Sequence, residues 1–267
     1  MKLYIYILSI FHIYFSLKFT KILFYTIVMK IKRSLSPNYS DKTRQKKRIK
    51  FVIIHYTGMQ SEIASIKRLR NSKAKVSCHY FINRKGEITQ MVKENKVAWH
   101  AGKSKWKNFN NLNDSSIGIE LVNKGHEFGY QNFSKYQIAS LISLCKFLKK
   151  KYMIKKENFL GHSDIAPLRK LDPGEKFPWE KLNKFKLGRW YKDDKRKLKL
   201  TNKEGLKNLF FKNLYLIGYR YFHVFKRRKK DKFVIKSFQQ HYLPNNVSGK
   251  IDKKTYKISQ FLVNSSK

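Results

Sequence analysis

The sequence predicts an α/β domain with a mixed central sheet flanked by helices, followed by a small C-terminal three-helix bundle. Three observations lead to this prediction. Apolar, β-branched runs recur between residues 51 and 161, which is the pattern of buried strands. Segments with helical spacing alternate with these runs and favour helices packed against a sheet. Beyond residue 200 only the helical spacing continues, which is typical of a small bundle.

The first half of the α/β domain is expected to contain a strand, a helix and a hairpin. The apolar run FVIIHY, residues 51–56, is typical of a buried strand. Residues 61–71 place apolar side chains at helical intervals behind a serine, a residue type that caps helices. The segment HYFINRKGEITQMV, residues 79–92, predicts two strands joined by a turn at Gly86.

The second half should add two strands and a long helix. SIGIELVN, residues 116–123, is a further apolar strand that contains one acid. Residues 134–151 place apolar side chains on one face of an amphipathic helix, and NFLG, residues 158–161, forms a short strand after it. We therefore expect the domain to span residues 35–184.

The C-terminal part follows a lysine-rich, irregular stretch, residues 185–200, which we interpret as a linker. Residues 201–265 then contain three apolar segments with helical spacing. These segments are GLKNLFFKNLYLIGY, FVIKSFQQHYL and KKTYKISQFLV. Three short helices packed around their Leu, Phe and Ile side chains would form the bundle.

The first thirty residues are apolar and aromatic, interrupted by Lys18 and Lys21. The run from Leu3 to Leu17 is short for a spanning helix but fits the apolar core of a signal peptide. No clear cleavage site follows, so an uncleaved membrane anchor or initiation at Met29 are the alternatives. We expect a periplasmic protein of the cell envelope, or a cytoplasmic one if translation starts at Met29.

The 267-residue chain carries 60 Lys and Arg against 17 Asp and Glu, a formal net charge of +43. Such a field indicates polyanionic surroundings, either nucleic acid, an anionic membrane or an anionic wall polymer. The abundance of Lys, Ile, Asn, Phe and Tyr leaves a second explanation open, the composition of an AT-rich genome. Because the chain has no zinc-finger spacing, RNP-type strand or helix-turn-helix pattern, we expect no specific nucleic-acid partner.

Cysteine usage gives little information about function. Cys78 and Cys145 are the only cysteines, which is too few for a disulfide framework, and neither lies in a CxxC pair. A bond between them stays open, but we favour two buried, small apolar side chains.

Two histidines and an aspartate stand at or after the ends of predicted strands. His55 ends the first core strand, His162 lies in GHSDIAP after a short strand, and Asp172 follows ten residues later. Two imidazoles and one carboxylate suit a catalytic Zn²⁺ ion, because they leave its fourth position open for water or substrate. Bound zinc lowers the pKa of water from 15.7 to about 7 and polarises a carbonyl.

Two charged residues could complete a hydrolytic site. Glu120 interrupts the strand SIGIELVN and could take the proton of the attacking water. Lys170, two residues before Asp172, could direct a positive charge at a developing oxyanion if that stretch is extended. The residues alone also allow simpler structural interpretations. His55 could be a structural hydrogen-bonding group, and Glu120 could face either side of the sheet. His162 could likewise belong to a capped turn.

Five phrases of the sequence together resemble one enzyme superfamily. They are FVIIHYTGM, VSCHYFINRKGEITQMV, VAWHAGKSKW, SSIGIELVN and GHSDIAPLRKLDPGEKFPW. In this order they are similar to the zinc N-acetylmuramoyl-L-alanine amidases of the type-2 amidase and peptidoglycan-recognition-protein superfamily, above all to its Gram-negative bacterial branch. The resemblance implies a type-2 amidase fold and zinc-dependent hydrolysis of the amide between N-acetylmuramic or anhydromuramic acid and L-alanine.

The resemblance also implies roles for particular residues. It gives His55, His162 and Asp172 as zinc ligands and Glu120 and Lys170 as catalytic residues. Trp99 and His100, in the WHAG segment, match the wall of the substrate groove. Cys78 stands where phage-type members have a catalytic tyrosine, so the acid of the predicted strand must serve instead.

The C-terminal segment resembles a three-helix peptidoglycan-binding module. The matching residues are Phe238, Gln239, Gly249, Ile251, Asp252 and Thr255. We expect peptidoglycan or muropeptides as partners, with an anionic wall or membrane surface as a further one through the basic charge. Two alternatives stay open, a bundle that is only a packing appendage and a protein that recognises muropeptides without cutting them.

Overall fold

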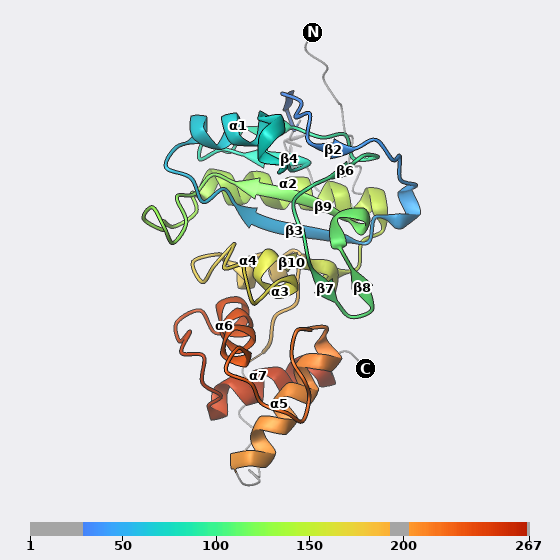
Figure 1. Cartoon of the computed structure of the whole chain (residues 1–267). Helices are drawn as coiled ribbons and strands as arrows, with labels where there is room; N and C mark the ends of the chain where they lie inside the picture. Colours follow the sequence, from blue (N-terminus) through green and yellow to red (C-terminus); the bar gives the residue numbers. More distant parts are fainter. Residues whose placement is uncertain (1–28, 193–202, 266–267) are drawn as a thin grey trace, which may run out of the picture.

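The computed structural model describes residues 29–192 and 203–265, and it places a six-stranded mixed sheet at the centre of the first domain (Figure 1). The strand order is β1-β5-β4-β9-β3-β10, and only β4 and β5 pair antiparallel. The six strands are β1 (Ile31–Arg33), β3 (Phe51–Tyr56), β4 (Tyr80–Ile82), β5 (Ile88–Gln90), β9 (Ser116–Leu121) and β10 (Phe159–Gly161). The predicted mixed sheet is confirmed, and so is the hairpin that turns at Gly86, whose φ is +85°.

Two helices of the first domain begin at serine caps, of which the first was predicted. The Ser61 side chain accepts from Ala64 N at the start of α1 (Glu62–Arg70). Ser134 forms a capping box with Gln137 at the start of α2 (Lys135–Tyr152). These caps satisfy backbone N–H groups that the first turn of a helix leaves without partners.

Alternation along the strands divides the core into two layers. Val52 and Ile54 of β3 pack in one hydrophobic cluster with the buried face of α2, which lies across that side of the sheet (Figure 1). Phe51 and Ile53 pack in a second cluster on the opposite face. His55 therefore shares its face with Phe51 and Ile53, away from α2.

Short elements connect the main ones and cover the strand ends. They are β2 (Tyr39–Ser40), β6 (Val97–Ala98), β7 (Lys105–Trp106), β8 (Phe109–Asn110), η1 (Lys46–Arg48), η2 (Ser72–Ala74), η3 (Leu112–Ser115), η4 (Lys156–Asn158), α3 (His162–Ile165) and α4 (Trp179–Lys184). Strands β2 and β6 pair antiparallel, as do β7 and β8.

The predicted domain limits need two corrections. Residues 31–33 lie before the expected start of the domain at residue 35, but they form β1 at the edge of the main sheet, in parallel register with β5. An edge strand as basic as Ile-Lys-Arg carries no apolar alternation that the sequence could reveal. At the other end, the expected linker begins with packed residues, because Leu187 is fully buried in the α2 cluster. The boundaries 35–184 and 201–265 otherwise remain predictions.

Three helices form the C-terminal module, as predicted. They are α5 (Lys203–Ile217), α6 (Asp231–Tyr242) and α7 (Lys253–Asn264). Asp252 caps α7 by accepting from Thr255 N at 2.7 Å. The Gln239 amide donates to the carbonyl of Lys250 at 2.8 Å, and its oxygen accepts from Gly249 N at 2.8 Å. Several residues that resemble a peptidoglycan-binding signature therefore join α6 to the turn before α7.

Cys78 and Cys145 are both buried and free, which agrees with the expected pair of small apolar side chains. Residues 1–28 of the predicted signal or anchor segment lie outside the described residues. Within the ranges described, no helix is both long and apolar enough to cross a membrane.

Candidate metal centre and catalytic site

The three predicted ligand residues converge at the ends of two neighbouring parallel strands. His55 lies near the end of β3, and β10 pairs with β3 so that Gly161 stands opposite Ile54. His162 follows Gly161 directly and begins α3. The loop after α3 returns to this point, where Ser163 N donates to the carbonyl of Asp172 at 2.8 Å. Because parallel strands end at the same edge of a sheet, residues more than a hundred positions apart meet here.

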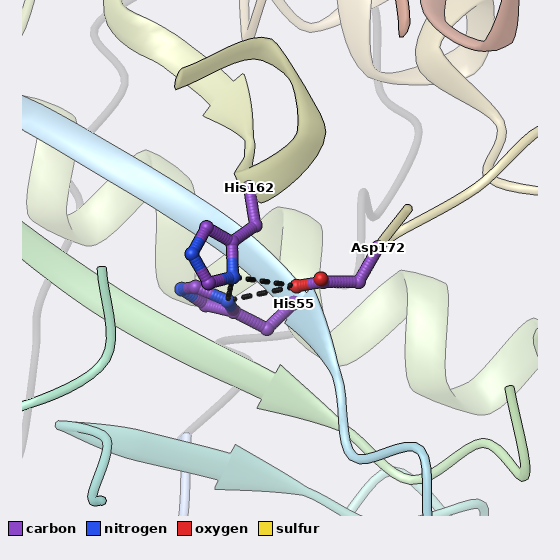
Figure 2. A group of neighbouring side chains, drawn as sticks. All are labelled: His55, His162 and Asp172. Carbon is purple, nitrogen blue, oxygen red and sulfur yellow. Dashed lines mark hydrogen bonds and ion pairs between the residues drawn. The ribbon is translucent and has the colours of Figure 1, made fainter. Parts of the chain in front are cut away.

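The side chains of His55, His162 and Asp172 point toward one another (Figure 2). The two Nδ1 atoms lie 2.9 Å apart, and Asp172 Oδ2 lies 2.9 Å from His55 Nδ1 and 3.1 Å from His162 Nδ1. All three residues are buried. Two imidazole nitrogens at this distance repel each other unless a proton or a cation lies between them.

This donor set fits a zinc ion. Zn–N and Zn–O bonds of roughly 2.0–2.2 Å in a tetrahedron separate the ligand atoms by about 3.3–3.5 Å, so small outward movements of these side chains would accommodate it. Two nitrogens and one carboxylate oxygen leave a fourth position open, as catalytic zinc sites do. The residues His55, His162 and Asp172 therefore form a candidate site for one metal ion.

A backbone carbonyl fixes the tautomer of His162. Its Nε2 lies 3.1 Å from the carbonyl oxygen of Ala101 and donates to it, which leaves Nδ1 with a free lone pair. The Arg169 guanidinium donates to the same carbonyl and to that of Lys103, and it lies 3.2 Å from His162 Nε2. Acceptors such as the Ala101 carbonyl orient metal-binding histidines and raise their basicity.

A chain of hydrogen bonds through His100 fixes the tautomer of His55. The Ser116 hydroxyl donates to the carbonyl of Leu112 at 2.5 Å and therefore accepts from His100 Nε2 at 3.1 Å. His100 Nδ1 is then an acceptor, and His55 Nε2 donates to it at 3.0 Å. His55 Nδ1 consequently carries no hydrogen and offers its lone pair to the ion. Gly118 leaves the room for this ring, because a Cβ there would lie 2.3 Å from His100 Cγ.

The protonation states also suit a metal. Burial, followed by the charge of His162, lowers the pKa of His55 to about 4, so this imidazole is neutral near pH 7. Burial alone would raise the pKa of Asp172, but the charges and hydrogen bonds of His162 and His55 outweigh it and hold that pKa well below its usual range. Metal ligands must be deprotonated, and these two residues already are.

Glu120 lies beside the ligands on the same face of the sheet. It pairs with His55 in the register of β3 and β9, and side chains at paired positions of parallel strands point the same way. Burial, followed by the charge of Asp172, raises its pKa well above the ordinary value. Among the residues that the structure describes, none hydrogen-bonds to its buried Oε2. A carboxylate oxygen without a partner beside a metal site is suited to accept a proton from water.

Lys170 brings a positive charge to this edge of the site. It is half-buried, and its charge lowers the pKa of both His55 and Glu120. It therefore lies close enough to influence both the ligands and the acid.

The two residues predicted to bind substrate lie in different environments. Trp99 is half-buried, with the Lys75 ammonium 5.9 Å from its ring centre. His100 is only 6% exposed and contacts His55, a place that favours orienting the ligand over touching substrate. Their role in substrate binding remains a prediction. The partners Ser116, Gly118 and Arg169 were not foreseen, although alternation in SIGIE already places Ser116 and Gly118 on the face of Glu120.

Comparison with known proteins identifies the same chemistry. The family model of the N-acetylmuramoyl-L-alanine amidases, Amidase_2, matches residues 45–175. The chain is 35% identical over 233 residues to the N-acetylmuramoyl-L-alanine amidase AmiD of Escherichia coli, covering 81% of this chain and 83% of that protein. It is 34% identical to the 1,6-anhydro-N-acetylmuramyl-L-alanine amidase AmpD of Haemophilus influenzae, over 56% of this chain and 89% of the relative.

Solved structures agree over most of the chain. The complex of E. coli AmiD with the substrate anhydro-N-acetylmuramic acid-L-Ala-D-gamma-Glu-L-Lys has a TM-score of 0.73 and 32% identity, covering 85% of this chain and 93% of that one. The structure of AMPDH3 from Pseudomonas aeruginosa also has a TM-score of 0.73 and 32% identity, covering 86% and 96%. These matches confirm the predicted type-2 amidase fold. The chain belongs to the type-2 family of N-acetylmuramoyl-L-alanine amidases.

Proposed function

We propose that this protein hydrolyses the amide bond between N-acetylmuramic acid, or its anhydro form, and the L-alanine of peptidoglycan stem peptides. The observation that carries the proposal is the convergence of His55 Nδ1, His162 Nδ1 and Asp172 Oδ2 within 4.8 Å, beside the buried acid Glu120. The relatives support the choice of substrate, since the AmiD complex contains an anhydromuramyl peptide. AMPDH3 has likewise been solved with an anhydromuramic pentapeptide.

One zinc ion, held by His55, His162 and Asp172, would supply Lewis acidity that acidifies water and polarises the scissile carbonyl. Glu120, as a carboxylate, removes the proton from the attacking water and returns it to the alanine nitrogen as that nitrogen leaves. Lys170 places a positive charge near the negative charge that develops on the carbonyl oxygen. The products are the muramoyl sugar and the free stem peptide.

A second candidate is a protein that binds muropeptides without cutting them. Loss of one metal ligand would favour that function, but this chain retains all three, with their ligand atoms 2.9–3.1 Å apart. The unpartnered oxygen of Glu120 also favours catalysis, because a binding protein gains nothing from burying it. The hydrolase is therefore the better supported function.

The place of action follows from the N-terminal residues and the charge. We propose that the protein works in the cell envelope, since residues 1–30 resemble a signal or anchor segment and a charge of +43 would hold it near anionic wall or membrane surfaces. Initiation at Met29 would instead leave it in the cytoplasm, where released muropeptides would be its substrates. Mass spectrometry of the mature N-terminus in cells distinguishes these two cases.

The activity is tested with the full chain and an anhydro-muropeptide substrate. Zinc content is measured first, and release of the stem peptide is then followed by mass spectrometry with and without a chelator. We expect about one zinc per chain, cleavage at the muramoyl–alanine bond, loss of cleavage with chelator and recovery on adding zinc. The His162→Ala variant serves as the matched control that should bind little zinc. Tight binding of the muropeptide without any cleavage by the zinc-loaded chain would support the recognition protein instead.

A further inference from the structure

The C-terminal module contacts the catalytic domain through a buried carboxylate two residues after His162. Asp164 is 1% exposed, and its Oδ2 accepts from Gly161 N at 2.8 Å and from His241 Nδ1 at 2.7 Å. Its Oδ1 accepts from the Tyr219 hydroxyl at 2.5 Å. Tyr219 follows α5 and His241 lies on α6, so two of the three donors to this carboxylate belong to the C-terminal module.

Aromatic packing fixes both donors. The His241 ring stacks on Trp179 of α4, with ring centres 4.0 Å apart and an interplanar angle of 10°. The Tyr219 ring meets Trp106 edge to face at 4.9 Å. Gly218 permits this close approach, because a Cβ there would lie 2.4 Å from the Trp106 indole. Neither donor can turn away from Asp164 without disrupting an aromatic contact.

A second contact joins the same helix to the loop after Asp172. The carboxylate of Glu175 lies 3.1 Å from His126 Nε2 and 3.4 Å from the Gln240 amide nitrogen on α6. His126 Nδ1 in turn accepts from the hydroxyl of Tyr56 at 2.8 Å, and Tyr56 is the neighbour of the ligand His55. Gln240 and His241, which are adjacent on α6, therefore contact Glu175 and Asp164. These two acids follow closely after the ligands Asp172 and His162.

The hydrophobic core is also continuous across this boundary. Phe51, Ile53 and Ile165 of the first domain share one buried cluster with Phe210 and Phe238 of the module. In Figure 1 the helices α5 to α7 lie against the side of the molecule where α3 and α4 cover the sheet. The module therefore packs against the segment that carries His162 and Asp172, residues 162–172. It is not attached to the first domain only by the connecting chain.

His162 begins a very short helix. Helix α3, which begins with His162, has only four residues, and a helix that short is not stable by itself. Asp164 caps its start by accepting from Gly161 N, so the position of His162 depends on where this carboxylate is held. Its other two hydrogen bonds come from Tyr219 and His241.

We propose that the C-terminal module is a structural part of the metal centre, in which Tyr219 and His241 act through Asp164, and Gln240 acts through Glu175, to position His162 and Asp172. This inference rests on the proposed zinc function and extends it. Three polar residues of α6 are at most 5% exposed, namely Gln239, Gln240 and His241. Because these side chains are buried, they do not bind wall glycan. Any binding of peptidoglycan by the module has to use another surface.

The test compares zinc affinity in variants that each remove one donor. Tyr219→Phe removes the hydroxyl that donates to Asp164 and keeps the ring, and Gln240→Ala removes the amide that contacts Glu175. Tyr215→Phe is the matched control, because this tyrosine on the same helix α5 is 48% exposed. Zinc affinity is measured by competition with a chelator, well below the unfolding temperature, and cobalt(II) absorption reports the geometry of the ligands.

We expect Tyr219→Phe to weaken zinc binding by about three- to tenfold, less than the roughly 10- to 100-fold effect of partners that contact a ligand directly, because Tyr219 acts through Asp164. Gln240→Ala should weaken it less, and the double variant should combine both losses. Tyr215→Phe should match the wild type. Wild-type zinc affinity and cobalt spectrum in both variants, with only a lower unfolding temperature, would show that the module is a packing appendage and overturn the proposal. Because no substrate is used, failure of the amidase activity itself is detected separately.

Discussion

His55 and Glu120 occupy paired positions on the adjacent parallel strands β3 and β9, with their side chains on the same face of the sheet. The sheet therefore supplies both a metal ligand and an unpaired acid from two rigid, central strands. Such strands hold side chains more precisely than loops do, which is what a proton transfer over hydrogen-bonding distance requires. The first two predictions follow from this relationship.

Replacing Glu120 by Gln should abolish turnover without removing the metal. The amide has the same shape but cannot take a proton, so we expect kcat to fall by about 10²- to 10⁴-fold. Zinc content should stay near one per chain, because Glu120 is not among the three ligand residues. Metal analysis and muropeptide turnover on the same sample check this. Turnover close to that of the wild type would remove the base role from Glu120.

Activity should fall in acid at a higher pH than an ordinary carboxylate would allow. A general base works only when deprotonated, and burial raises the pKa of Glu120 well above 4.5. As the pH is lowered, Glu120 therefore takes up its proton before a solvent-exposed acid would. His55, whose pKa burial lowers to about 4, should keep its metal-binding form to lower pH. We expect kcat to decline while zinc is still bound, which parallel pH profiles of kcat and zinc content will show. If kcat and zinc content instead fall together, protonation of the metal ligands and not of Glu120 causes the loss of activity at low pH.

Many residues of the candidate site could be predicted from the sequence, but the way they are arranged in space could not. The ligands were found through their motifs, since His55 and His162 are 107 residues apart and no spacing rule joins them. From the sequence alone Glu120 could face either side of the sheet, because alternating apolar residues surround it on both sides. Only the register of β9 against β3 shows that it faces His55.

Two further residues have partners that lie far away in the chain and that no local pattern indicates. His100 was grouped with Trp99 as a substrate contact, since both belong to WHAG and nothing local indicates a bond to His55. Asp164 resembled the acid of a capped turn, and it does cap α3. Its buried donors, however, come from residues 219 and 241, which lie in what the sequence presents as a separate domain.

Lys170 should contribute charge to catalysis at a small cost to metal binding. Its charge lowers the pKa of His55, and the same repulsion acts on a bound cation. Lys170→Met should therefore reduce kcat by about 10²- to 10³-fold, as loss of one oxyanion-stabilising group does, while zinc affinity stays equal or rises slightly. Steady-state kinetics and chelator competition measure the two effects. A clear loss of zinc affinity would mean that Lys170 supports the ligands instead.

Replacing His100 should affect the metal, and replacing Trp99 should affect the substrate. His100→Phe keeps a ring but removes the acceptor for His55 Nε2, so zinc affinity should fall by about 10- to 100-fold. Ser116→Ala removes the hydroxyl that accepts from His100 Nε2, one hydrogen bond further from the metal. It should also lower zinc affinity, but by less. Trp99→Ala should raise KM and leave zinc affinity unchanged. If His100→Phe raises KM at normal zinc affinity, the original substrate-binding assignment is the correct one.

Gly118→Ala provides the sharpest structural test of the hydrogen-bond chain behind the metal. The added Cβ would lie 2.3 Å from His100 Cγ, and both residues are held in a buried layer that cannot easily move. We expect a loss of about 1–3 kcal/mol in the free energy of unfolding, typical of overpacking, together with weaker zinc binding as the His100 ring is displaced from His55. Combining the change with His100→Ala removes the atoms that clash. The double variant should therefore be no less stable than His100→Ala alone, and denaturant unfolding of the four proteins measures this coupling. Equal destabilisation by Gly118→Ala in both backgrounds would place the strain in the strand backbone rather than at His100.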